Sequence, residues 1–424
     1  MKTNKTLLSA AVAFGLLSTS SVANAAGFQL AEYSATGLGR AYAGEAAMAD
    51  NASAQWRNPA MLTYLEGTQV SVGAIYVDPN IDIDGEITTP SLTGDNRGAT
   101  SAKDIAHSAV VPNFYLSHMY NDQWAVGFAL GTNYGMETEL ESTFNATHFG
   151  DEAKVMTVEA LTSLAYKINE QFSVGAGVRY VTGEGHFGAS NKKLGTLKYM
   201  EGDDSSWGYQ IGAAWQINDT NRVGFAYKSE VTMDFDGYAT GYGFNDKNPS
   251  AKKDGSLEII LPATAEIASY SQITEQLGVH ASVNWTDWST FKELKANFKD
   301  GTSDVIKTEN WKDNYRFAIG TTYQWDQKLT LRSGVAYDTA AVDDKYRTTT
   351  IPETDRTWLS VGASYEFTKN LTLDGGFTYI LAKDAPIKEP RDQSDKLSSL
   401  IGGEFQGEIS GDIWLIGVQA NYTF

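Results

Sequence analysis

Few residues in this chain have types and spacings that could carry out chemistry. The sequence contains no cysteine, which excludes thiol catalysis, iron–sulfur clusters and disulfides. It contains five histidines: His107, His118, His148, His186 and His280. No two of them have the close spacing of a metal-binding pair, so no metal site is expected.

Two short motifs could still indicate a reaction or a cofactor. Gly37-Leu38-Gly39 is similar to a phosphate-binding loop, but no strand precedes it and the third glycine is displaced to Gly44. His280 alternates with Ser282 and Asn284 along one expected strand, which would place three polar side chains on one face. A hydrogen-bonded structural histidine explains this pattern as well as catalysis does. We therefore expect neither an enzyme nor a bound cofactor.

The composition narrows the class of protein further. The chain has 424 residues, with 52 acidic and 33 basic side chains and a net charge of −19. Such an acidic chain is not expected to bind nucleic acid, because phosphate contacts need clustered Lys and Arg. Its content of 42% hydrophobic and 12% aromatic residues is too high for a disordered chain.

Residues 1–25 have the pattern of a secretory signal peptide. Lys2 and Lys5 precede an apolar stretch over residues 7–17, and Ala23-Asn24-Ala25 supplies small residues at the expected cleavage site. This stretch is too short to cross about 30 Å of hydrocarbon, so we expect cleavage and a mature chain beginning at Ala26. No later apolar run approaches the length of a membrane-spanning helix.

From Gly67 onward, apolar and small polar residues alternate in stretches of about ten residues, which indicates β-strands. Residues 172–180 and 315–325 are clear examples. Short turns are expected near Asn121-Asp122, Asn169-Glu170, Asn218-Asp219, Gln272-Ile273, Asp326-Gln327 and Lys369-Asn370. Long polar loops are expected at residues 79–105, 136–153, 186–205, 237–255, 299–309, 339–354 and 382–410.

Six short turns and seven long loops would join fourteen strands, all antiparallel. An even strand number with turns at one end and loops at the other is typical of an outer-membrane β-barrel, since only a closed sheet leaves no unpaired edge in lipid. The alternative is a soluble sandwich or lipocalin-like barrel, whose outer face would be charged. Here the non-aromatic face is Gly, Ser, Ala, Asn, Gln and Thr, which suits a barrel lumen. The predicted fold is therefore an all-β transmembrane barrel over residues 67–424.

The ends of the expected strands support a location in the outer membrane. Aromatic pairs gather there, as at Tyr323/Trp325 and Tyr365/Phe367. The last strand finishes at Phe424, a terminal aromatic residue of the kind that the barrel assembly machinery reads. That machinery and the lipid of the outer membrane are therefore expected partners.

Residues 26–66 break the alternating pattern. They are rich in Ala and Gly, yet carry apolar anchors such as Phe28, Tyr42, Trp56 and Leu62 that a solvated tail would not need. A barrel of fourteen strands is wide enough to enclose such a segment. We predict that residues 26–66 form a hatch inside the lumen.

Several sequence segments resemble the FadL-type long-chain fatty acid transporters of Gram-negative outer membranes. They occur in the family's order along the whole chain: Ala26-Gly27-Phe28-Gln29-Leu30, Gly37-Leu38-Gly39-Arg40-Ala41-Tyr42, Arg57-Asn58-Pro59-Ala60, Asn133-Tyr134-Gly135, Ser229-Glu230-Val231, Trp311-Lys312-Asp313, Tyr315-Arg316 and Tyr422-Thr423-Phe424.

The resemblance implies roles for particular residues. Asn58, Pro59 and Ala60 would form the signature turn of the hatch, and Asn133, Tyr134 and Gly135 the kinked third strand that opens the barrel wall sideways. Phe28 and Lys307 would contact the ligand, with Lys307 binding the carboxylate. The family's second basic residue has no counterpart, because its position falls near Ala189, with Lys192 and Lys193 only nearby.

The resemblance also implies a function. We expect passive uptake of long-chain fatty acids, with capture at the extracellular loops, binding in the lumen, movement of the hatch and release through the wall. Other hydrophobic compounds, such as aromatic hydrocarbons, are the alternative ligands. A monomer is expected, and phage could use the loops.

Overall fold

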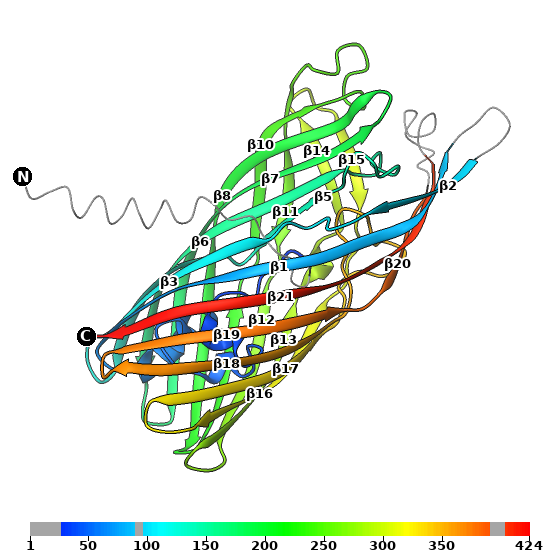
Figure 1. The fold of residues 1–424 in the computed structure, drawn as a ribbon. Helices are drawn as coiled ribbons and strands as arrows, with labels where there is room; N and C mark the ends of the chain where they lie inside the picture. Colours follow the sequence, from blue (N-terminus) through cyan, green and yellow to red (C-terminus); the bar gives the residue numbers. More distant parts are fainter. Residues whose placement is uncertain (1–26, 90–95, 391–402) are drawn as a thin grey trace, which may run out of the picture.

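The computed structural model describes residues 27–89, 96–390 and 403–424, which form one closed β-barrel with a short segment inside it (Figure 1). The expected signal peptide, residues 1–25, lies outside the described residues. The sheet has 21 strand segments, and seven barrel strands consist of two segments each, so that the barrel has 14 strands. This confirms the predicted fold class.

Seven barrel strands are single segments: β1 (Thr68–Thr89), β6 (Glu152–Lys167), β7 (Phe172–Asn191), β8 (Gly195–Asn218), β17 (Leu329–Asp338), β18 (Arg356–Thr368) and β21 (Phe405–Thr423). The other seven are interrupted: β2 (Asn96–Ala102) with β3 (Ala109–Met119), β4 (Trp124–Gly131) with β5 (Gly135–Glu139), β9 (Asn221–Lys228) with β10 (Val231–Thr240), β11 (Lys253–Leu261) with β12 (Thr264–Gln272), β13 (Leu277–Thr286) with β14 (Glu293–Phe298), β15 (Ser303–Thr308) with β16 (Asn314–Gln324), and β19 (Leu371–Ala382) with β20 (Ala385–Glu389).

The first and last strands close the barrel. β1 pairs antiparallel with β21 from Gln69 opposite Thr423 to Ile87 opposite Phe405. Six short connections lie at one end, where they join β3 to β4, β6 to β7, β8 to β9, β12 to β13, β16 to β17 and β18 to β19. These connections fall at the turns expected from the sequence.

The outer surface of the barrel is apolar. Along β16, Phe317 and Ile319 are 49% and 58% exposed, whereas the alternate residues Arg316 and Ala318 are buried inside the barrel. Exposed aromatic side chains lie near the short turns: Tyr120, Trp124, Phe172, Trp215, Tyr323, Trp325, Phe367, Tyr422 and Phe424. Such an apolar band bordered by aromatic residues is typical of a barrel in lipid. In the described part of the chain, no helix is both long and apolar enough to cross a membrane.

Several expected loops are largely strand, so their predicted extents were wrong. β1 continues to Thr89, and only three residues separate the end of β7 at Asn191 from the start of β8 at Gly195. Residues 299–309, also expected as a loop, contain β15. Figure 1 shows these extensions projecting from the end opposite the short turns. Beyond the lipid the outer face meets water, so backbone pairing continues without the apolar alternation that reveals a strand.

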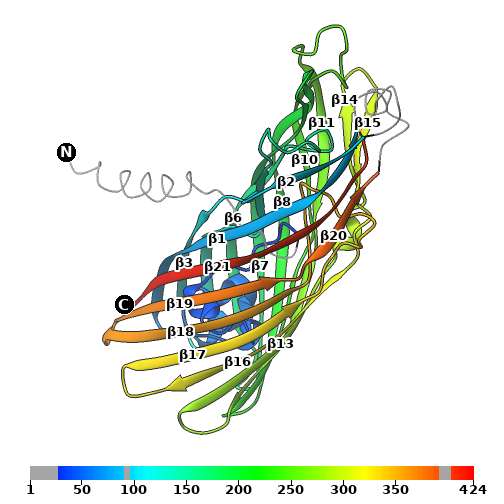
Figure 2. The same ribbon diagram turned by 45° about the vertical axis from the view of Figure 1, so that its right-hand side comes forward.

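Residues 27–66 lie inside the barrel, where Figures 1 and 2 show them in blue behind the wall. They contain four short helices, α2 (Ala35–Leu38), η1 (Glu45–Ala47), α3 (Ala54–Arg57) and η2 (Pro59–Tyr64), and one further short helix, η3 (Trp288–Thr290), follows β13. Ser34 begins α2 by accepting a hydrogen bond from the Gly37 amide. Asn58 likewise accepts from the Ala60 amide, and Pro59 takes the first helical position, where its missing donor costs nothing.

The hatch segment packs directly against wall glycines. A Cβ atom at Gly212 would lie 1.9 Å from the Asn58 side-chain oxygen, and one at Gly224 would lie 1.9 Å from the Ala46 carbonyl oxygen. Any side chain at these two wall positions would therefore collide with the hatch. The segment is fitted closely to the wall at these contacts.

Candidate ligand-binding lumen

An apolar cavity lies in the half of the lumen farthest from the short turns. Seven strand segments, β5, β6, β7, β8, β10, β11 and β14, contribute to its lining. Its larger apolar side chains are Phe28, Met136, Val155, Phe187, Met200, Phe235, Ile259, Phe291, Leu294, Phe298 and Ile351. A concave space with a mostly hydrophobic lining is typical of a small-molecule site.

Phe28 lines the cavity from the hatch side. Its ring lies 4.6 Å from that of Trp288 and 5.6 Å from that of Phe291, both in edge-on arrangements. The Gly135 amide donates to the Phe28 carbonyl oxygen over 2.8 Å, which fixes the backbone there. Phe28 is therefore in a position to touch a cavity ligand, although its role as a ligand contact stays a prediction.

Lys307 lies outside the cavity lining. It is on β15, opposite the cavity residue Leu294, and its Nζ donates to the Glu389 carboxylate. The other oxygen of Glu389 accepts from the hydroxyl of Thr349 over 2.8 Å. Both charged side chains of the pair are about nine-tenths buried, so a ligand carboxylate would have to compete with Glu389 for Lys307. Of the lysines near Ala189, Lys192 donates to the Asn145 side-chain oxygen over 2.7 Å.

Glu309 adds a second acidic group next to Lys307. It directly follows β15, in the end of the barrel opposite the short turns, and one of its oxygens accepts from the Trp311 indole over 2.9 Å. Burial raises the pKa of Glu309 to about 7, and the nearby Lys307 charge limits that rise. The surroundings of Lys307 therefore become more negatively charged as the pH rises through about 7.

The third barrel strand is interrupted at Asn133, Tyr134 and Gly135, the residues that the resemblance implied. β3 pairs with β4 as far as Phe114 opposite Leu130, whereas β5 continues the ladder on its other side, with β6. An isolated bridge from Ala106 to Thr138 is the remaining ladder contact toward the preceding strand. The wall thus loses its regular pairing at the kink.

The N-terminal segment occupies the backbone edge that the kink leaves open. The Leu30 amide donates to the Asn133 carbonyl oxygen over 2.7 Å, and Gln29 forms an isolated antiparallel bridge with Tyr134. Sequence reasoning missed this pairing, because a single bridge leaves no alternating pattern. Residues 28–30 therefore act as a short extra strand at the kink.

A charged cluster beside the kink was also missed. The Asn133 amide donates to the Glu159 carboxylate over 2.6 Å, and Arg179 donates to the same carboxylate over 2.8 and 3.0 Å. Lys228 donates to the Asn133 side-chain oxygen over 3.3 Å and lies 3.7 Å from Glu159. The signal in the sequence would have been charged residues at positions where the strand pattern places lumen-facing side chains.

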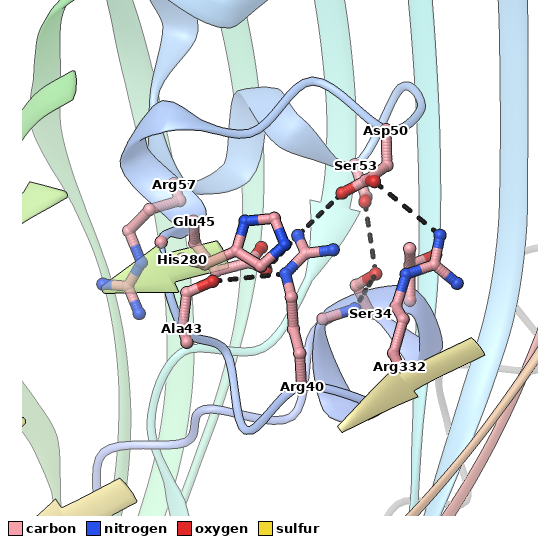
Figure 3. A network of polar contacts seen from close by, with 12 residues as sticks. Ser34, Arg40, Ala43, Glu45, Asp50, Ser53, Arg57, His280 and Arg332 are labelled. Atoms are coloured by element: carbon pink, nitrogen blue, oxygen red, sulfur yellow. Dashed lines mark hydrogen bonds and ion pairs between the residues drawn. The ribbon is translucent and has the colours of Figure 1, made fainter. Parts of the chain in front are cut away.

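A second buried ion network holds the hatch together (Figure 3). Arg40 binds Glu45 over 2.6 Å and Asp50 over 2.7 Å. Arg332 on β17 lies 3.7 Å from Asp50, which links the hatch to the wall. Figure 3 shows His280 close to this network. Because charges in a low-dielectric interior are costly when unpaired, this network resists rearrangement.

His280 has the contacts of a structural lumen residue. Its Nε2 lies 2.9 Å from the Thr322 hydroxyl, and its ring stacks on Tyr270 with centroids 5.4 Å apart. Among the described residues, no group of three or more metal-ligating His, Asp or Glu side chains is present.

The closed barrel, its lipid-facing surface and the apolar cavity next to an internal segment define the class of outer-membrane transporters of hydrophobic compounds. Residues 16–424 match the family described as outer membrane protein transport protein (OMPP1/FadL/TodX), and the chain belongs to this family. It is therefore a FadL-type transporter of the cell outer membrane.

Relatives are similar over their full length. The chain is 35% identical to "Outer membrane protein P1" of Haemophilus influenzae, with 100% of both chains covered. It is 33% identical to "Long-chain fatty acid transport protein" of Escherichia coli K12, covering 100% of this chain and 99% of the relative.

Among solved structures, a FadL homologue of Pseudomonas aeruginosa matches with a TM-score of 0.82 at 23% identity, over 94% of this chain and 100% of the other. The toluene transporter TbuX of Ralstonia pickettii matches with a TM-score of 0.67 at 19% identity, over 93% and 100%. At these identities the structures show a shared fold.

Proposed function

We propose that this protein takes up long-chain fatty acids by passive transport. The observation that carries the proposal is the apolar cavity inside a barrel whose outer face meets lipid. The name of the 33% identical Escherichia coli relative supports the same ligand class. We further propose that residues 26–66 act as the hatch and residues 67–424 as the barrel.

The cavity supplies binding energy through burial of the ligand's hydrocarbon chain. Each methylene removed from water contributes about 0.8 kcal/mol, so a chain of about 15 methylenes gains up to roughly 12 kcal/mol before the loss of motion is subtracted. Tight binding therefore needs few polar contacts. The polar groups near the cavity would determine which head groups bind.

The proposed route leads from the extracellular loops into the cavity and out through the kink at Asn133-Tyr134-Gly135. Residues 28–30 cover that kink, and Phe28 also lines the cavity. A ligand that displaces Phe28 would therefore disturb the segment that closes the exit. In this proposal, cavity binding and exit opening are coupled through one short stretch of backbone.

Aromatic hydrocarbons are the second candidate ligands. The cavity is lined by aromatic and aliphatic side chains, and Lys307, the expected carboxylate partner, is held by Glu389. The related fold of the toluene transporter TbuX is consistent with an aromatic ligand. A neutral ligand would not need a free cation.

Competition binding separates the two candidates. Purified protein in detergent is titrated with a fluorescent long-chain fatty acid, and either hexadecanoate or toluene is added as competitor. We expect hexadecanoate to displace the probe at micromolar concentrations and toluene at concentrations at least a hundredfold higher. Displacement by toluene at equal or lower concentrations would contradict the proposal and favour an aromatic ligand.

A further inference from the structure

The charged cluster at the kink carries more positive than negative charge. Glu159 is the single carboxylate between Arg179 and Lys228, and all three side chains are at least nine-tenths buried. The nearby pair of Arg57 and Glu266, 3.0 Å apart, is balanced and leaves this surplus unchanged. An unbalanced cation in a buried site is costly unless an anion joins it for part of the time.

Lys228 is the cation with capacity to spare. Arg179 is committed to both oxygens of Glu159 and to the Ser229 carbonyl oxygen. The Lys228 ammonium has one long hydrogen bond of 3.3 Å to Asn133 and lies 4.3 Å above the Trp56 ring of the hatch. An ammonium group has three donors, so Lys228 can donate to a further oxygen atom.

The cluster lies at the end of the kink nearer the short turns, and the cavity adjoins its other end. Val155 lines the cavity, and Glu159 is four residues further along β6 toward the short turns, which is about 13 Å at roughly 3.3 Å per residue. On the opposite side, Asn133 joins the cluster directly to the kink. Met136, the residue after the kink, lines the cavity, so a head group that moves from the cavity along the kink toward Asn133 reaches the cluster.

We propose that Lys228 forms an inner carboxylate site, which receives the ligand's head group as the ligand leaves the cavity for the kink. This inference rests on the proposed transport of fatty acids. The site would take an anionic head group attached to a hydrocarbon chain. The spare donors of Lys228 would hold the carboxylate next to Asn133, at the kink through which the ligand leaves.

The test compares uptake of hexadecanoate with uptake of the uncharged hexadecan-1-ol in Gram-negative cells that lack their own transporter. Lys228→Met should reduce the uptake rate of hexadecanoate about tenfold or more and leave that of the alcohol within about twofold, because a charge-assisted hydrogen bond is lost for the acid alone. Glu159 keeps Arg179 as its partner in this variant, so no buried carboxylate is left unpaired. Lys228→Arg, which keeps the charge, is the matched control and should retain most of the acid uptake.

The outcomes separate the inference from the proposed function. Equal losses for acid and alcohol would show that Lys228 supports the wall only, and unchanged acid uptake would show that it does not contact the head group. Either result overturns the inference while wild-type uptake of hexadecanoate upholds the proposed function. If wild-type cells take up no hexadecanoate, the proposed function itself fails. Should Lys228→Met not reach the membrane folded, as judged by heat-modifiable migration, Lys228→Gln gives the same comparison with a neutral donor.

Discussion

The partner of Lys307 determines how this residue could recognise a ligand. Its ammonium is bound to Glu389, so a fatty acid must displace that carboxylate to reach it. Removing the competing charge should therefore strengthen binding, whereas removing the lysine should weaken it. Because Lys307 is paired with Glu389, its variants report how the ligand carboxylate competes with Glu389 for the ammonium.

Glu389→Gln should tighten hexadecanoate binding about tenfold and leave binding of the methyl ester unchanged. Lys307→Ala should weaken acid binding by about tenfold to a hundredfold, with little effect on the ester. Equilibrium binding to purified protein measures both. The ester is the internal control. An equal change for acid and ester in both variants would show that Lys307 does not bind the ligand carboxylate.

Glu309 gives the protein a stability that depends on pH. Its pKa is about 7 in the folded protein against an ordinary value of 4.5. Because the folded pKa is higher, the stabilisation is complete below about pH 4.5 and is lost as the pH rises through about 7, by roughly 3 kcal/mol. Glu309→Gln should raise the apparent melting temperature in detergent, relative to the wild type, more at pH 8 than at pH 5. An identical difference at both pH values would show that Glu309 does not titrate in this range.

At the scale of elements, the pairing of residues 28–30 with the kink is the arrangement that could open. Gln29 and Tyr134 face each other between two flanking backbone hydrogen bonds, Leu30 to Asn133 and Gly135 to Phe28. This makes them a pair without hydrogen bonds of their own, in which the Cα atoms approach to about 4.5 Å. A disulfide can span that distance.

Gln29→Cys combined with Tyr134→Cys should lock the N-terminal segment onto the kink, and the native chain has no cysteine to interfere. We expect the oxidised double variant to lose at least nine-tenths of fatty acid uptake and to recover it on reduction. Each single variant, treated in the same way, is the control for the loss of the native side chain. Undiminished uptake with the crosslink shown by mass spectrometry would mean that the ligand leaves by another path.

The sequence predicted the barrel elements better than the contacts between them. Strands such as β16 were identifiable because their residues alternate between apolar side chains that face lipid and small or polar side chains that face the lumen. The β7 and β8 extensions had no such signal, since water replaces lipid beyond the membrane. The cluster of Glu159, Arg179 and Lys228 depends on the register of three strands, which no single strand's pattern specifies.

At the scale of the whole molecule, the outer surface and the interior serve different purposes. The apolar exterior suits lipid, and the closure of β1 on β21 leaves neither the first nor the last strand with an unpaired edge in the outer membrane. The hatch and its ion network fill part of the lumen, and the apolar cavity occupies the rest. Cleavage before Ala26, recognition of Phe424 by the assembly machinery, a monomeric state and use by phage stay predictions.

Uptake by intact cells tests the central claim most directly. Gram-negative cells that lack their own fatty acid transporter would express this chain and be given radiolabelled hexadecanoate, with toluene and a small hydrophilic sugar as comparison solutes. The account predicts saturable uptake of hexadecanoate at least tenfold above that of cells without the chain, and no increase for the sugar. Entry of the sugar, or uptake of toluene without uptake of hexadecanoate, would contradict it.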